Sequence, residues 1–226
     1  MTSVDRNAPP RHQTMTAAIA WSYELLSPAE RRFFARLSVF AGGFSLEAAE
    51  AVCDGDGDVL DLLRRLVTKS LVIAEPGVDG MMRYRLLEPL RDFGGDALGR
   101  AQEANPIQQR HAAFYADLAR LSNLVISDMA GGRWFGVMAR EHDNLHAAMR
   151  WLHKNDDIAG ALIAGTAVAE VWRLRGHIGE ARALLALLLE LPGAGDSAVA
   201  QAGVLMLAGQ LACFQGDLAA AVLPYT

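Results

Sequence analysis

The fold of the first half of the chain is indicated most clearly by residues 58–86, which read DVLDLLRRLVTKSLVIAEPGVDGMMRYRL. Over residues 58–68, apolar side chains recur every three or four positions, which predicts a helix with one buried face. The period then changes. Residues 71–74 are a short apolar run and residues 82–86 alternate between apolar and basic, on either side of the turn sequence at 76–80. A helix followed by a β-hairpin is typical of the last helix and the wing of a winged helix.

Three more helices are predicted upstream of this segment. Residues 15–26 carry an apolar stripe at helical spacing, and Ser27 with Glu30 forms a capping box for the next helix. Ser45 can cap a third helix. With residue 58 starting the fourth helix, in the recognition position, we assign a winged-helix domain to residues 13–100.

The second half is predicted to be entirely helical. Asn105-Pro106 marks a break after the first domain, and no strand alternation follows it. The pattern Gly176-His177-x-x-Glu180-Ala181 recurs further along the chain as Gly216-Asp217-x-x-Ala220-Ala221, which indicates a helical repeat. We therefore predict a mainly α protein, with a helical-repeat region at 105–226 after the winged helix.

This repeat region is expected to be truncated, because residues 218–226 supply only the start of a further helix. An array that stops there would leave apolar surface without cover. The side chains expected to lose part of their cover are Leu207, Leu211 and Phe214.

The distribution of apolar residues indicates where in the cell the protein is located. Residues 1–12 are polar and contain no apolar run that could act as a signal peptide, so we expect a disordered N-terminus or linker. The longest apolar stretch, residues 158–169, is shorter than the roughly 18 residues of a membrane span. These features predict a cytoplasmic protein without membrane contact.

Several stretches resemble one bacterial family, the STAND-type transcriptional regulators with AfsR-like and LuxR-like members. They are RHQTMTAAIAWSYELL at 11–26, LLEPLRDF at 86–93, EHDNLHAAMRW at 141–151 and VWRLRGHIGEAR at 171–182. The resemblance implies the segment that follows the NB-ARC ATPase core, a winged helix joined to tetratricopeptide-like repeats. Leu87 occupies the position of the histidine that senses nucleotide phosphate in related winged helices, so direct nucleotide sensing is not expected there.

The motifs of catalysis are missing from the sequence. It contains no G-x-x-x-x-G-K-[ST] loop for phosphate, no G-x-S-x-G elbow and no metal-binding motif. Cys53 and Cys213 fit neither a disulfide framework nor metal-ligand spacing. We therefore expect no enzyme, no cofactor, and no catalytic, cofactor-binding or metal-ligating residue.

The main hypothesis is a non-enzymatic regulatory and protein-interaction segment of a STAND-type transcriptional regulator. In this hypothesis the winged helix restrains an ATPase domain, present in the same parent chain or supplied in trans. The helical repeats would bind a protein partner or an inducer. The alternative is an autonomous winged-helix DNA-binding transcriptional regulator whose repeats form a sensor domain.

A set of basic residues bears on the choice between these hypotheses. They lie on the fourth helix, directly after it and on the wing, where a winged helix contacts DNA or another domain: Arg64, Arg65, Lys69, Arg83 and Arg85. Residues 1–100 contain 12 Arg and Lys against 14 Asp and Glu, a net charge of −2. From this balance we expect that nucleic acid is not a partner, and that duplex DNA is not bound at physiological salt.

Overall fold

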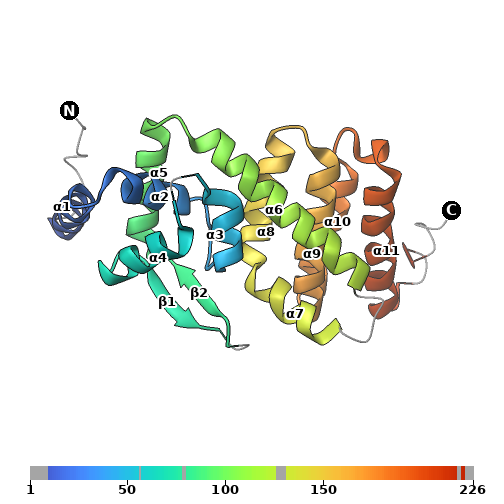
Figure 1. The fold of residues 1–226 in the computed structure, drawn as a ribbon. Coiled ribbons are helices and arrows are strands. Elements are labelled where there is room, and N and C mark those ends of the chain that lie inside the picture. Colours follow the sequence, from blue (N-terminus) through green and yellow to red (C-terminus); the bar gives the residue numbers. More distant parts are fainter. Residues whose placement is uncertain (1–9, 56, 78–79, 126–130, 218–219, 222–226) are drawn as a thin grey trace. The chain divides into compact units, whose positions relative to one another are not determined.

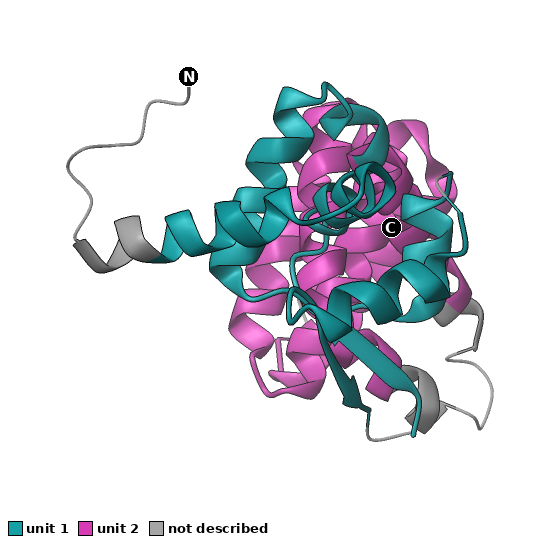
Figure 2. Ribbon diagram, turned by 60° about the vertical axis from the view of Figure 1, so that its left-hand side comes forward, with its two compact units in different colours: residues 1–107 teal, residues 108–226 magenta. Residues whose placement is uncertain are grey.

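The computed structural model describes residues 10–55, 57–77, 80–125, 131–217 and 220–221. The chain forms two compact units, Met1–Ile107 and Gln108–Thr226, coloured separately in Figure 2. The division falls inside a helix, and each unit has its own buried apolar core.

Both units are mainly helical, which confirms the predicted fold class (Figure 1). Unit 1 contains α1 (Pro10–Glu24), α2 (Pro28–Leu37), α3 (Leu46–Cys53), α4 (Val59–Thr68), β1 (Ile73–Pro76), β2 (Met82–Arg85) and α5 (Glu88–Arg100). Helix α6 (Ala104–Val125) continues into unit 2, followed by α7 (Gly131–Arg140), α8 (His142–Lys154), α9 (Ile158–Leu174), α10 (Ile178–Leu189), the short 3-10 helix η1 (Ala194–Asp196) and α11 (Ala198–Phe214).

Helix α2 is the centre of unit 1, and the predicted capping box fixes its start. The Ser27 hydroxyl accepts a hydrogen bond from the Glu30 N–H at 3.3 Å, and the Glu30 carboxylate accepts one from the Ser27 N–H at 2.7 Å. Helix α2 packs against α3, α4 and α5. Each large apolar side chain buried there stabilises the fold by about 2 kcal/mol. The largest are Phe33, Phe34, Leu37, Phe40, Phe44, Leu63 and Leu66.

The wing is a two-stranded antiparallel sheet in which residues 73–76 face residues 85–82. It is joined to the turn after α2 through Phe44, which exchanges two backbone hydrogen bonds with Tyr84 at 2.8 and 2.9 Å. The Phe44 and Tyr84 rings also stack, with centroids 6.0 Å apart. The sequence pattern did not predict this bridge, because a single paired residue has no periodicity.

The first strand starts two residues later than predicted. Leu71 and Val72 are buried, but both donate their backbone N–H to the carbonyl of Leu66, at 3.0 and 3.4 Å. Ser70 takes a left-handed conformation with φ of 58°. These two apolar residues therefore close the end of α4 and do not belong to the sheet.

The break between the two halves also differs from the prediction. Helix α5 ends at Arg100, Gln102 is left-handed with φ of 59°, and α6 begins at Ala104. Pro106 thus lies in the first turn of α6, where its missing N–H costs no helical hydrogen bond. At the other end, α1 already begins at Pro10, within the segment expected to be a linker.

Three helix ends in unit 2 share one backbone geometry. The residues Asp156, Gly176 and Gly216 have positive φ angles of 61°, 84° and 75°. In each case the next residue donates its N–H to the carbonyl five positions earlier, as in a Schellman motif. The turns at Gly176 and Gly216 are the two that the sequence echo links, and the turn at Asp156 precedes the first of them by half of their spacing.

Helix α9 packs against α8, α10 and α11. A glycine permits its close approach to two of them. A Cβ atom on Gly165 would lie 2.5 Å from a methyl group of Leu188 and 3.1 Å from the sulfur of Met149. Both distances are shorter than a normal contact, so α9 reaches this position because residue 165 has no side chain.

The expected exposure of α11 is partly wrong. Leu207 and Leu211 are buried, because α11 packs against both α9 and α10. Phe214 is exposed as predicted, with the guanidinium of Arg173 5.8 Å from its ring centroid. The short further helix expected after Gly216 falls mostly outside the described residues. In the part of the chain that is described, no helix is long and apolar enough to cross a membrane.

Candidate nucleic-acid interface

Helix α4 has one buried and one solvent-facing side. Its N-terminus is capped by Asp58, whose carboxylate accepts hydrogen bonds from two backbone N–H groups at 2.9 and 3.2 Å. The buried side consists of Val59, Leu62, Leu63 and Leu66. The solvent-facing side consists of Asp61, Arg64, Arg65 and Thr68, and these four residues are called the α4 stripe below. Asp61 is three and four residues before the two arginines, and Thr68 is three and four residues after them, which places all four on one face of the helix.

The two arginines of the α4 stripe differ in their surroundings. Arg65 donates a hydrogen bond from Nε to a carboxylate oxygen of Asp61 at 2.9 Å, and one of its terminal nitrogens forms an ion pair with the same oxygen at 2.8 Å. Both side chains are half exposed or more, so the pair adds little to stability. Arg64 has no hydrogen bond or ion pair from its guanidinium within the described residues. The sequence predicted both arginines as contact residues but not this difference.

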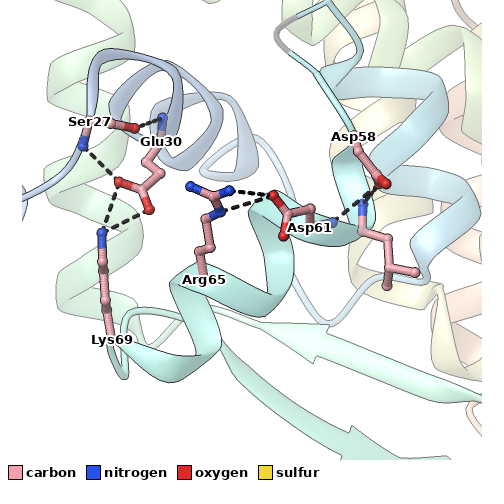
Figure 3. A network of polar contacts seen from close by, with 7 residues as sticks. Ser27, Glu30, Asp58, Asp61, Arg65 and Lys69 are labelled. Carbon is pink, nitrogen blue, oxygen red and sulfur yellow. Dashed lines mark hydrogen bonds and ion pairs between the residues drawn. The ribbon is translucent and has the colours of Figure 1, made fainter.

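Lys69 is held inward, toward the start of α2. Its ammonium group contacts both oxygens of the buried Glu30 carboxylate, each at 2.8 Å, and Figure 3 shows Lys69 and Ser27 converging on that group. Burial raises the pKa of the Glu30 carboxyl. The hydrogen bonds from Lys69 and Ser27 outweigh burial, so that the pKa lies below its ordinary value. Lys69 therefore joins the end of α4 to the start of α2.

The two wing arginines are also engaged within unit 1. Arg83 donates a hydrogen bond to the backbone carbonyl of Gly43 at 2.7 Å. Arg85 forms an ion pair across the hairpin with Glu75 at 3.1 Å, and both side chains are exposed. The five basic residues predicted as contacts thus divide into two on the α4 stripe and three with partners elsewhere in the unit.

Sequence reasoning missed a buried polar cluster in unit 2. The carboxylate of Glu141 accepts hydrogen bonds from the Tyr115 hydroxyl and the Asn144 amide, both at 3.0 Å, and His111 lies 3.4 Å from Asn144. Burial lowers the pKa of His111 to about 4, against a smaller opposite effect of Asn144. The i, i+3 spacing of Glu141 and Asn144 was visible in the sequence, but their burial was not.

Metal chemistry finds no support among the described side chains. No group of three or more His, Cys, Asp or Glu residues in that part of the chain is placed to hold a metal ion. Three consecutive acidic and histidine residues, Glu141-His142-Asp143, point to different surroundings. Glu141 belongs to the buried cluster, whereas Nδ1 of His142 lies 3.3 Å from a carboxylate oxygen of Asp143.

Comparison with known proteins identifies a domain in the first unit and relatives that align with most of the chain. The family model described as a winged helix-turn-helix domain matches residues 26–98. The chain is 38% identical over 189 residues to the Mycobacterium tuberculosis protein named "Putative HTH-type transcriptional regulator Rv0890c", and equally to Mb0914c of Mycobacterium bovis. It is 36% identical over 131 residues to "Uncharacterized protein Rv0894" of Mycobacterium tuberculosis.

The relatives are much longer than this chain. The alignment with the two regulators covers 82% of this chain but 21% of each of them, so the chain spans about a fifth of their length. The alignment with Rv0894 covers 56% of this chain and 32% of that protein. No solved structure gives a significant match.

These findings correct one expectation. Nucleic acid was excluded as a partner on the net charge of residues 1–100, whereas the winged helix-turn-helix match and the likeness to HTH-type regulators point to DNA. Net charge is an average over a domain, but contact with DNA depends on the face that meets it. The matches also favour the alternative hypothesis over restraint of an ATPase. With α2, α3 and α4 followed by a two-stranded wing, residues 26–98 form a winged helix-turn-helix domain.

Proposed function

We propose that the winged helix binds double-stranded DNA, and that the chain is part of a transcriptional regulator without catalytic activity. The α4 stripe carries this proposal. Helix α4 is the second helix of the α3–α4 pair, which is the position that enters the major groove in helix-turn-helix proteins. Its solvent-facing side presents two arginines, one of them without a partner among the described residues. The likeness to proteins named HTH-type regulators supports the same function.

The charge distribution is compatible with this function. Four of the carboxylates near α4 are already engaged: Asp58 caps the helix, Asp61 binds Arg65, Glu30 binds Lys69 and Glu75 binds Arg85. Their negative charge is thereby partly compensated within unit 1. Arg64 would then contact a phosphate directly, and such contacts supply most sequence-independent affinity for DNA.

Binding of the full chain to fluorescent duplexes of random sequence, measured by anisotropy at several salt concentrations, tests the proposal. We expect binding that weakens with salt, and Arg64→Ala should reduce the log–log slope by roughly 0.9. Arg100→Ala on α5 is the matched control, since it removes the same charge outside α4 and the wing. A chain that binds no duplex at low salt would refute the proposal.

For unit 2 we propose a helical-repeat, tetratricopeptide-like sensor that binds a protein partner or an inducer. Support comes from the turns at Gly176 and Gly216, which share both backbone geometry and hydrogen bonding. Repeats of this kind stack into extended binding surfaces. The direct test is whether a partner captured by the full chain is lost when Gly165→Val disturbs the packing of α9 while unit 1 stays folded.

A further inference from the structure

Arg64 and Arg65 on the α4 stripe have different surroundings, which suggests that they contact different parts of DNA. This inference rests on the proposed DNA binding and concerns what each arginine would contact. The two side chains lie on the same exposed face of α4, yet only Arg65 is bound to a carboxylate on the same helix. Figure 3 shows Arg65 directed toward Asp61.

The geometry of the pair leaves part of the guanidinium available. Nε of Arg65 donates a hydrogen bond to one carboxylate oxygen of Asp61 at 2.9 Å, and one terminal nitrogen lies 2.8 Å from the same oxygen. A guanidinium has five N–H donors in a fixed fork, so one donor on each terminal nitrogen remains available on the end away from Nε. Those two end-on donors match the O6 and N7 acceptors of guanine, the base that arginine contacts in the major groove.

The same pairing disfavours a phosphate contact. A carboxylate 2.8 Å away offsets the positive charge that a phosphate would attract, and it favours one orientation of the guanidinium. A preferred orientation helps recognition of a planar base edge, whereas attraction to phosphate needs only charge. Arg64 has the opposite properties, since its side chain is exposed and has no partner among the described residues.

We propose that Arg65, held by Asp61, recognises a guanine in the major groove, and that Arg64 contacts the DNA backbone. Arg65 would then determine specificity, Asp61 would position it, and Arg64 would supply affinity. Lys69 and Arg83 have no part in recognition, because Glu30 and the Gly43 carbonyl hold them.

The test begins with selection of duplexes from a random pool by the full chain. Affinities are then measured for the selected site and for versions in which each G·C pair is replaced by A·T. We expect the parent chain to lose roughly 10- to 100-fold in affinity at one such position. Arg65→Ala should abolish that preference, and Arg65→Lys should do the same although it keeps the charge.

Two further variants distinguish the roles. Arg64→Ala should weaken binding to all duplexes by one common factor and reduce the salt slope by roughly 0.9. Asp61→Asn should weaken the guanine preference while raising affinity for unrelated duplexes, because Arg65 gains both freedom and uncompensated charge. The positions changed all lie on the solvent-facing side of α4, and thermal unfolding of each variant confirms that it is folded.

The outcomes separate this inference from the proposed function. If Arg65→Ala and Arg64→Ala both weaken all duplexes equally, Arg65 is a phosphate contact and the inference is wrong, while DNA binding stands. If Arg65→Lys keeps the full guanine preference, the fork is not used and the inference is also wrong. If the parent chain binds no duplex, the proposed function fails and the inference fails with it.

Discussion

At the scale of single residues, Glu30 has two structural tasks. It completes the capping box of α2 and it binds Lys69 at the end of α4, while its side chain is 4% exposed. Replacing Lys69 by Met leaves a buried carboxylate with the Ser27 N–H as its remaining strong donor. We expect a loss of about 2 kcal/mol in the free energy of unfolding, measured by urea denaturation.

The double variant Glu30→Gln/Lys69→Met tests whether the loss of stability comes from the unpaired carboxylate. An uncharged amide needs no counter-ion, so the double variant should be more stable than Lys69→Met alone. Equal stability of the two variants would show that Lys69 acts through its aliphatic stem.

His111 makes the stability of unit 2 depend on pH. Its folded pKa is about 4, below the ordinary 6.5, because the ring is buried. Between these values the unfolded chain binds a proton that the folded chain does not. The stabilising contribution is therefore complete above pH of about 6.5 and is lost as the pH falls toward 4, by about 3 kcal/mol.

Denaturant unfolding at pH 7 and pH 5 checks this expectation. His111→Gln should reduce the pH dependence of the free energy of unfolding, even if it lowers stability at pH 7. His153→Gln, at an exposed histidine of α8, is the matched control for the substitution itself.

At the scale of elements, Gly94 sets the distance between α5 and α2. A Cβ atom there would lie 3.0 Å from the Cβ of Ser38 and 3.4 Å from the Phe34 ring. Gly94→Val should therefore overpack this contact and destabilise unit 1 by about 2 kcal/mol. Gly99→Val is the control on the same helix, because a Cβ there would have no atom of another described segment within 4 Å. Its effect on thermal unfolding should be small.

The elements themselves were largely predictable, because their causes are local. Ser27 with Glu30, Ser45 and Asp58 each cap a helix as the sequence indicated. The errors occurred where backbone hydrogen bonds that leave no side-chain pattern decide. Leu71 and Val72 look like a strand but close α4, because both donate their N–H to the carbonyl of Leu66 after the left-handed Ser70.

At the scale of the whole molecule, the two units should lose structure in separate steps. Each has its own buried core, and the titrating His111 lies in unit 2. In scanning calorimetry we expect two transitions, of which only the one from unit 2 moves to lower temperature between pH 7 and pH 5. A single transition that shifts as a whole would show that the units unfold together.

The sequence predicted the residues of the candidate site but not their surroundings in the folded molecule. The sequence identified the five basic residues, but partners distant in sequence determine which of them face solvent. Lys69 is 39 positions from Glu30, and Arg83 is 40 positions from Gly43. Net charge could not replace this information, and it led to the wrong conclusion about nucleic acid.

The ion pair between the buried Glu30 and Lys69 at the end of α4 has a consequence for evolution. A single change at position 69 leaves a buried carboxylate without its counter-ion, and a single change at position 30 removes both the carboxylate half of the capping box and the partner of Lys69. Lineages that diverge here must therefore pass through a less stable intermediate or change both positions at nearly the same time. Among homologous winged helices, the identities of the residues at positions 30 and 69 should covary, with Glu and Lys retained or lost as a pair.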